Sequence, residues 1–432
     1  MFGDRWQAIL GKRGDATALW VPGGQISFRE LDARARVLPT QKCPKLGAFY
    51  LAQGDGCEVA CALLAAFLTG RPVHVVERDR LRRVPKTRPP RGTALIKQTV
   101  GSSGSRRCQF FSFAQIAADA DRLHAALKLE ACDAAVAAVS VAHSFGLSTT
   151  LLQTLLHGLP VHWLPNPFPS AVAEALAQHE RAFLPGVPAM WKAWLLAGLN
   201  SEHIGLAVSA GSTLTANLEA QVWEAMRLKL HNLYGTSECG AISYDASAQP
   251  RTDSEDLGLL LPGVRAVEHR DGRLLVTSDA VALGYDEIHP NELLKNAEHL
   301  TWDRVRMDGQ RLTFRHCLGA GINVASRKLS PADIAAKIKA ATGLGHVRVY
   351  GRTSRDSERV QDIVVAVDVP EAELTHAFKA HACAALASWE VPRQWQSEQP
   401  PPAHEPVERS KTSASPPGEL GSLPQGEAIP AL

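Results

Sequence analysis

One pattern occurs twice in the first half of the chain: an apolar helical segment ends at a glycine and a short apolar strand follows. Residues 59–69 precede Gly70 and a strand expected over residues 72–76. The same order returns over residues 151–164, LLQTLLHGLPVHWL. Glycine is a common residue just after a helix, because it adopts the left-handed backbone conformation at low cost. Alternating helices and strands predict a layered α/β fold with partly parallel sheets.

Beyond about residue 260 the pattern changes to hairpins and then to a short α+β segment. The dipeptide Asp271-Gly272, for example, separates two strand-like runs and is typical of a hairpin turn. We therefore predict a large N-terminal α/β domain over residues 1–315 and a small α+β domain over residues 316–400.

The last segment, residues 401–432, has a different composition. From Pro400 onward the chain holds eight of its 27 prolines, among serine, glutamate and glycine. Such a segment cannot bury enough apolar surface to offset the entropy of ordering, so we predict a largely disordered tail.

Composition excludes several classes of protein. The chain has 432 residues, 46 of them basic and 44 acidic, which indicates no nucleic-acid partner. Its eight cysteines include no Cys-x-x-Cys pair, as expected for a protein of a reducing compartment. The N-terminus lacks a signal-peptide pattern, and the apolar run over residues 59–68 is too short to span a bilayer. We expect a cytoplasmic protein without stable membrane insertion.

The run TVGSSGSRRC, residues 99–108, is rich in glycine and serine and ends in arginines. Backbone N–H groups and hydroxyls in such a loop can surround a phosphate. The run lacks the Gly-Lys-Ser/Thr ending of a P-loop and the spacing of a Gly-x-Ser-x-Gly hydrolase turn. Apolar segments at 94–99 and 108–111 flank it, so we expect it to join two strands. An ordinary surface hairpin is the alternative interpretation.

A second informative run is HNLYGTSECG, residues 231–240. It combines a strand end with hydroxyl side chains and the carboxylate of Glu238, which are hard oxygen ligands of the kind that magnesium prefers. The small-residue turn in residues 206–214, LAVSAGSTL, leaves room for a flat base against the backbone. Taken one at a time, Tyr234 is equally compatible with a core position and Gly211 with a plain turn.

At this point the chain resembles the adenylate-forming enzymes, a superfamily that includes acyl-CoA synthetases, aryl-CoA ligases and carrier-protein adenylation domains. TVGSSGSRRC is similar to the phosphate loop of the family, and VAHSFG to its His-x-x-Gly segment at the acyl pocket. FLPGVPAMW and LAVSAGSTL resemble the next two landmarks, and NLYGTSE resembles Tyr-Gly-x-Thr-Glu. INVASRKLSP is similar to the segment that opens the mobile C-terminal lid domain. The matches occur in the family's order over nearly the whole chain.

The resemblance implies an ATP site. The residues that it assigns to ATP are Thr99, Ser102, Ser103 and Gly104 at the phosphates, and Gly211, Ser212, Leu233, Tyr234, Gly235, Thr236 and Ser237 around adenine and the adjoining phosphate.

Five further roles follow from the same resemblance. Glu238 is expected to bind Mg²⁺, and Asp303 to bind the ribose hydroxyls. Lys411 is expected to reach the substrate carboxylate and the α-phosphate from the tail. Arg107 takes the place of the family's loop lysine, with a planar fork instead of a compact ammonium. His143 is expected at the acyl pocket, and a core histidine bonded to the backbone is the alternative.

The activity that the resemblance implies is ATP-dependent activation of a carboxylic acid, fatty or aryl, to acyl-AMP with release of pyrophosphate. Transfer to a thiol of CoA or of phosphopantetheine on an acyl carrier protein would follow. One alternative is a non-catalytic relative that binds a nucleotide or acyl group and acts as a partner protein. It is suggested by the altered hinge, whose acid falls at Gly319 or Ala320, and by Ala325-Ser326 in place of the family's Gly-Gly. A phosphotransferase is disfavoured, because no Walker lysine or kinase signature accompanies the loop.

Overall fold

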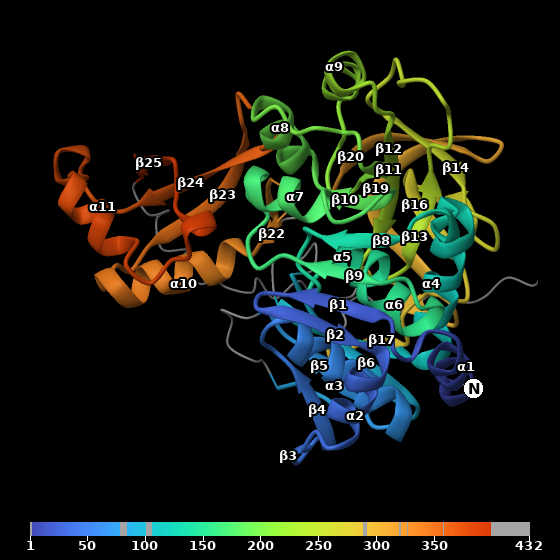
Figure 1. Ribbon diagram of the computed structural model, residues 1–432. Coiled ribbons are helices and arrows are strands. Elements are labelled where there is room, and N and C mark those ends of the chain that lie inside the picture. The colour runs from blue at the N-terminus through green and yellow to red at the C-terminus, as the bar shows by residue number, and fades with distance from the viewer. Residues whose placement is uncertain are drawn as a thin grey trace, which may run out of the picture.

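The structure is a computed structural model with a large α/β domain and a smaller α+β domain at its C-terminal end, as the sequence predicts (Figure 1). It describes residues 2–77, 84–100, 106–287, 292–318, 321–325, 327–356 and 358–398.

The larger sheet of the large domain has 14 strands and changes direction at β12. On one side of this point the strands β12, β11, β10, β8, β9 and β1 are parallel. In that order they span Leu230–Thr236, Ile204–Ser209, Ala182–Gly186, Ala134–Ala137, Val161–Trp163 and Thr17–Val21, and β2 (Gly24–Ser27) closes the edge. Because parallel strands all end at the same edge of a sheet, their following loops meet there.

On the other side of β12 the strands of the same sheet are antiparallel. They are β13 (Gly240–Tyr244), β14 (Asp256–Leu260), β20 (Arg311–Cys317), β19 (Glu298–Asp308), β16 (Arg273–Thr277), β15 (Arg265–Glu268) and β18 (Leu294–Lys295). The hairpin expected around Asp271-Gly272 is the β15–β16 pair. The predicted domain boundary at residues 315–316 lies inside β20, which is paired with β19 and β14.

The second sheet of the large domain has six strands. They are β17 (Gly284–Tyr285), β7 (Arg106–Ser112), β6 (Thr93–Val100), β5 (Val73–Val75), β4 (Gly47–Ala52) and β3 (Gln41–Cys43). The strands β4, β5 and β6 are parallel, whereas β6 and β7 pair antiparallel with Thr99 opposite Arg107. The glycine-serine run therefore connects two neighbouring strands, as predicted.

Nine α-helices belong to the described part of the large domain. They are α1 (Phe2–Arg13), α2 (Phe28–Arg36), α3 (Gly56–Thr69), α4 (Phe113–Leu127), α5 (Ser144–Thr149), α6 (Leu151–His157), α7 (Pro169–Leu176), α8 (Pro188–Leu196) and α9 (Ala216–Met226). A short 3₁₀ turn, η1, spans Leu129–Ala131. No helix among the described residues has the length and apolar character needed to cross a membrane.

Local sequence signals explain where several helices begin and end. Ser27 and Ser112 each cap a helix and form the capping boxes expected from their spacing. The apolar helix α3 is buried along most of its length and stops at Gly70, which has a φ of 67°. One apolar core extends from α1, α2 and α3 through α4 and α6 to both sheets. The two sheets and the helices between them therefore form one packed unit.

The small domain has its own apolar core, formed by residues between Ile322 and Ala382. Its elements are β21 (Ile322–Val324), β22 (Arg327–Leu329), α10 (Pro331–Thr342), β23 (Val347–Thr353), β24 (Gln361–Val367), η2 (Glu371–Glu373), α11 (His376–Ala382), η3 (Ser388–Glu390) and β25 (Gln394–Ser397). Lys192 of α8 contacts it through Asp356, at 2.9 Å, and Glu358, at 3.2 Å. The predicted tail, residues 401–432, lies outside the described residues.

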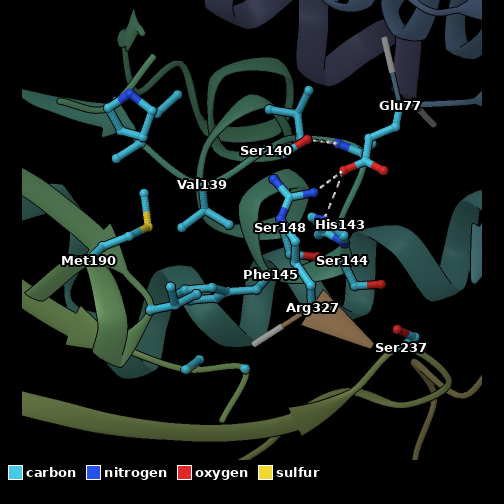
Figure 2. Close-up of a pocket in the computed structure, with 18 of the residues that line it drawn as sticks. Glu77, Val139, Ser140, His143, Ser144, Phe145, Ser148, Met190, Ser237 and Arg327 are labelled. Atoms are coloured by element: carbon cyan, nitrogen blue, oxygen red, sulfur yellow. Dashed lines mark hydrogen bonds and ion pairs between the residues drawn. The ribbon is translucent and has the colours of Figure 1, made fainter. Parts of the chain in front are cut away.

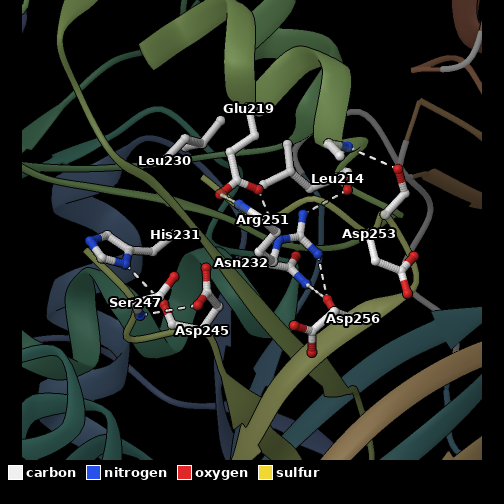
Figure 3. A network of polar contacts seen from close by, with 12 residues as sticks. Leu214, Glu219, Leu230, His231, Asn232, Asp245, Ser247, Arg251, Asp253 and Asp256 are labelled. Carbon is white, nitrogen blue, oxygen red and sulfur yellow. Dashed lines mark hydrogen bonds and ion pairs between the residues drawn. The ribbon is translucent and has the colours of Figure 1, made fainter. Parts of the chain in front are cut away.

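A buried group of charges lies where the larger sheet changes direction (Figure 3). Glu219 of α9 is completely buried and accepts hydrogen bonds from the backbone N–H and Nε of Arg251, at 2.9 and 2.8 Å. Lys229, directly before β12, is ion-paired with Glu219 and with Asp245, the latter at 2.7 Å. The group therefore links α9, the start of β12 and the segment after β13.

The guanidinium of Arg251 also ties two backbone segments together. Its Nη2 donates to the carbonyl of Leu214 at 2.8 Å, and its Nη1 donates to the carbonyl of Asp256 in β14. Each nitrogen of this guanidinium thus has an acceptor, which helps a charge to be tolerated in a protein interior.

We predict that Arg251→Met lowers the free energy of unfolding by about 3–5 kcal/mol, because it leaves a buried carboxylate short of a partner and removes the guanidinium donors from the carbonyls of Leu214 and Asp256. Urea unfolding followed by circular dichroism measures the change. Arg29→Met is the matched control, since Arg29 pairs with Asp15 at an exposed position and should leave the urea midpoint nearly unchanged. Equal effects of the two substitutions would contradict the importance of the buried group.

Candidate active site

A cleft of about 750 Å³ opens where the carboxyl ends of the parallel strands meet. Residues at or just beyond the ends of β5, β6, β8, β9, β10, β11 and β12 line it, and the small domain contributes Ala325, Arg327 and Trp389. Ligands of open α/β sheets bind at this edge, so the cleft is the candidate active site.

The structure brings several residues predicted from separate motifs into this cleft. Those that line it are Thr99, His143, Gly211, Leu233, Gly235, Thr236 and Ser237. They come from the end of β6, the start of α5, the turn after β11 and the end of β12. Ser102, Ser103, Gly104 and Lys411 are predicted site residues that lie outside the described residues.

Two of the lining positions require glycine. Gly211 has a φ of 90°, a conformation that other residues adopt only with strain. A Cβ on Gly235 would lie 2.3 Å from the carbonyl oxygen of Gly240, closer than any real contact. Gly235 thus lets β12 pack closely against β13, Gly211 makes the turn after β11, and neither residue places a side chain in the cleft.

Ser212, Tyr234 and Asp303 are predicted ATP residues that do not line the cleft. The hydroxyl of Tyr234 donates to Asp303 Oδ2 at 2.8 Å, which joins β12 to β19. Burial, together with this carboxylate, raises the pKa of Tyr234 well above its ordinary value. The Tyr234 hydroxyl therefore stays protonated and positions Asp303 next to the end of β12.

Glu238, the predicted metal ligand, lies just beyond β12 and is mostly buried. Its Oε1 accepts hydrogen bonds from Gln109 Nε2, at 2.8 Å, and from the Tyr285 hydroxyl. His299 Nε2 lies 3.9 Å from the other carboxylate oxygen. In the described part of the chain no three His, Cys, Asp or Glu side chains form a metal-binding group. Glu238 is not among the residues that line the cleft.

Arg107 is placed differently from the prediction that it serves the phosphate loop. Its side chain is almost fully buried and forms a two-pronged ion pair with Glu292. The guanidinium also lies over the Tyr285 ring, 3.8 Å from its centroid. Glu292 neutralises the charge of Arg107, and this pair links β7 to the segment before β18. Arg107 is absent from the cleft lining.

His143 lies at the mouth of the cleft in a three-residue cluster that sequence reasoning did not predict (Figure 2). Glu77 Oε1 lies 3.3 Å from His143 Nε2 and 3.0 Å from Arg327 Nη1. Arg327 belongs to β22, so this carboxylate connects the two domains across the cleft. The position of Glu77 directly after a buried strand is the sequence signal that could have identified it.

One wall of the cleft is apolar. Val139, Phe145 and Met190 face one another there (Figure 2), and Trp163 and Trp194 are also among the lining residues. A hydrocarbon or aromatic group fits this wall, whereas the hydroxyl side chains of Thr99, Thr236 and Ser237 lie on another part of the lining.

Lys97 is a second residue that the sequence analysis missed. It lies in β6 two residues before Thr99, is 7% exposed and lines the cleft. Its Nζ donates to Ser144 Oγ at 2.7 Å and lies 4.1 Å from the centroid of the Phe111 ring. Burial lowers the pKa of Lys97 to about 8, and the attraction of Asp119 and Glu238 partly opposes this. A lysine within the apolar strand ALIKQT is the signal that could have revealed it.

We predict that Lys97→Met raises the free energy of unfolding by about 2–3 kcal/mol at pH 7. A pKa lowered from 10.5 to about 8 means that folding disfavours the ammonium by about 3 kcal/mol. The gain should shrink between pH 8 and 10.5, where the unfolded wild-type chain still binds the proton that the folded protein has released. Urea titrations of both proteins at pH 7 and pH 10 test this, and a less stable variant at pH 7 would contradict it.

The comparisons with known proteins show the family of this chain. The model of the AMP-binding enzyme family matches residues 52–285, more than half of the chain, and the chain belongs to that family. The resemblance to adenylate-forming enzymes is thereby confirmed.

Solved structures share the fold over nearly the whole chain. A malonyl-CoA ligase with methylmalonyl-CoA and AMP bound is 18% identical, with 90% of this chain and 97% of that chain covered and a TM-score of 0.73. The o-succinylbenzoate-CoA synthetase of Bacillus subtilis is 14% identical, with 92% and 95% covered and a TM-score of 0.75. An amide bond synthetase of Marinactinospora thermotolerans is 16% identical, with 92% and 96% covered and a TM-score of 0.73.

Proposed function

We propose that this protein activates a carboxylic acid with ATP, forming acyl-AMP and pyrophosphate, and then transfers the acyl group to a thiol of CoA or of a carrier protein. The observation that carries the proposal is one cleft that combines the bare backbone at Gly211 and Gly235 with hydroxyl side chains and an apolar wall. The glycine backbone and the hydroxyl side chains suit adenine and phosphates, and the apolar wall suits a fatty or aryl acid.

In the first step a carboxylate oxygen of the acid forms a bond to the α-phosphorus, and the bond from that phosphorus to the pyrophosphate oxygen breaks. Thr99, Thr236 and Ser237 supply hydroxyl donors at the phosphate end of the cleft. Asp303, held by Tyr234, is the candidate partner of the ribose hydroxyls. Catalysis of this kind rests on positioning and on donors that stabilise developing charge.

Glu238 follows the cleft-lining Ser237 without being part of the lining itself, and its carboxylate is the candidate ligand of a magnesium ion that also binds the phosphates, because Mg²⁺ usually takes one or two carboxylates and completes its shell with substrate oxygens and water. The ion would neutralise phosphate charge. Gln109 and Tyr285 hold the Glu238 carboxylate in place for this role.

In the second step a thiolate sulfur attacks the acyl carbon and AMP leaves. The proteins that share this fold include CoA ligases and an amide bond synthetase, which differ in the acceptor of the acyl group. Product analysis with CoA, with a phosphopantetheine carrier and with amines separates these acceptors.

Pyrophosphate exchange with a panel of fatty and aryl acids tests the first step. Exchange with at least one acid is expected. ATP binding without exchange for any acid would instead support the alternative, a non-catalytic relative that acts as a partner protein.

We predict that His143→Ala lowers thioester formation more than adenylation, because His143 lies at the cleft mouth beside Glu77 and the small domain. Single-turnover assays of acyl-AMP formation and of acyl transfer from supplied acyl-AMP measure the two steps. If Glu77 mediates the effect, Glu77→Gln should show the same split, and the double variant should lose no more than either single one. An equal loss in both steps would assign His143 a structural role.

We also predict that Lys411→Ala abolishes acyl-AMP formation, with a loss on the order of 10² or more, as for other single donors that stabilise transition-state charge. The variant should still bind ATP and should still transfer an acyl group from supplied acyl-AMP. Lys379→Ala, at another lysine of the C-terminal region, is the control. Near-normal adenylation by the Lys411 variant would remove this residue from the site.

A further inference from the structure

Lys97 is a buried cation whose hydrogen-bonding capacity is mostly unused. An ammonium has three N–H donors, and one described side chain, Ser144, accepts from it. Among the described residues no carboxylate lies within ion-pair distance of Nζ. The structure thus holds a charge in its interior, at a cost in stability, with Nζ over the Phe111 ring and short of hydrogen-bond acceptors where the residue lines the cleft.

The two nearest carboxylates already have partners of their own. Asp119 Oδ1 accepts the backbone N–H of Ala241 at 2.9 Å, and Glu238 Oε1 is held by Gln109 at 2.8 Å. Both attract the Lys97 ammonium from a distance and so favour its charged form. They keep the cation charged near neutral pH without occupying its donors.

The position of Lys97 within the cleft separates it from the reacting centre. Thr99 lies at the end of β6 where the phosphates are expected, and Lys97 lies two residues earlier on the same strand. Two residues of a strand span roughly 6–7 Å. A group that meets Lys97 is therefore separated by a short spacer from a group bound at Thr99.

The surroundings of Lys97 suit the far end of a small acid. Ser144 and Ser148 of α5 lie one helical turn apart and both line the cleft beside it. Phe145, between them, contributes to the apolar wall together with Met190 (Figure 2). A chain or ring can pack on that wall while a polar terminus reaches the ammonium.

We infer that Lys97 binds a second carboxylate on the acid substrate, so that the substrate class of this cleft is a dicarboxylic acid rather than a simple fatty or aryl acid. The inference rests on the proposed function for the identity of the ligand as an acid. Lys97 is then a specificity-determining residue: it selects the acid by its second anionic group.

Binding of matched acids tests the inference. Adipate is compared with hexanoate and 6-hydroxyhexanoate, and terephthalate with 4-methylbenzoate, by thermal shift and titration calorimetry at pH 7. We expect wild-type protein to bind a diacid more tightly than its neutral-ended counterparts. Lys97→Met and Lys97→Gln should weaken diacid binding on the order of 10- to 100-fold, the usual effect of losing a charged hydrogen bond, and leave the others unchanged. Lys12→Met, at an exposed lysine of α1, is the control and should change nothing.

Several results would overturn the inference. One is that no diacid binds at millimolar concentration, or that monoacids bind wild-type protein as tightly as diacids. Another is that the Lys97 variants lose affinity for all acids equally, which would place Lys97 at the reacting carboxylate. A third is that they lose affinity for the diacid and the hydroxy acid equally, which would indicate that Lys97 donates to a neutral oxygen of the substrate and not to a second carboxylate. Pyrophosphate exchange is measured separately: selective diacid binding without exchange would contradict the proposed function and leave the Lys97 site standing.

Discussion

The ion pairs that the buried Glu219 carboxylate forms with Arg251 and Lys229 are the interaction on which the rest of the architecture depends. Glu219 holds Arg251 and Lys229 at the place where the larger sheet passes from parallel to antiparallel strands. Parallel strands are covered by the helices that connect them, whereas antiparallel strands lack this regular cover. The strand at which the sheet passes from parallel to antiparallel pairing is therefore held by other contacts. That strand is β12, and its carboxyl end supplies Leu233, Gly235 and the hydroxyl residues that follow to the cleft. The geometry of the nucleotide end of the site is thus set by charges that never meet a ligand.

Arg251, Arg107 and Lys97 are buried cations of two kinds: those paired with a buried acid, and one that has no such partner among the described residues. In the first, each guanidinium nitrogen of Arg251 has an acceptor, so the charge fixes the fold. Glu292 likewise neutralises Arg107, which is absent from the cleft lining, although the buried Nε of Arg107 has no hydrogen-bond partner within the described part of the chain. In the second, Lys97 has one accepting side chain and a lowered pKa, so its burial opposes folding. Unpaired charge of this kind is concentrated at functional sites, where a ligand completes the arrangement.

How far the sequence predicts this structure depends on the distance between the residues that interact. Capping boxes at Ser27 and Ser112, the helix end at Gly70 and the strands on both sides of the glycine-serine run follow from neighbouring residues, and all are present. The motifs also predict which backbone segments converge on the cleft. Contacts between distant segments carry no such signal: Glu77 and Arg327 are 250 positions apart, and Arg107 and Glu292 are 185 apart. The orientation of Arg107, the cluster at the cleft mouth and the role of Lys97 therefore required the structure.

The contacts between the domains are weaker in kind than those within the large domain. Arg327 and Lys192 reach across to the other domain from partly exposed positions, with side chains 34% and 39% exposed, whereas the acids that they meet, Glu77 and Glu358, are 14% and 5% exposed. Pairs of this kind lie between an exposed ion pair, which contributes about 1 kcal/mol or less, and a fully buried one. The Glu219 group is buried within the large domain, and breaking it costs about 3–5 kcal/mol. Loss of the contacts between the domains would therefore leave β12 and its neighbours in place.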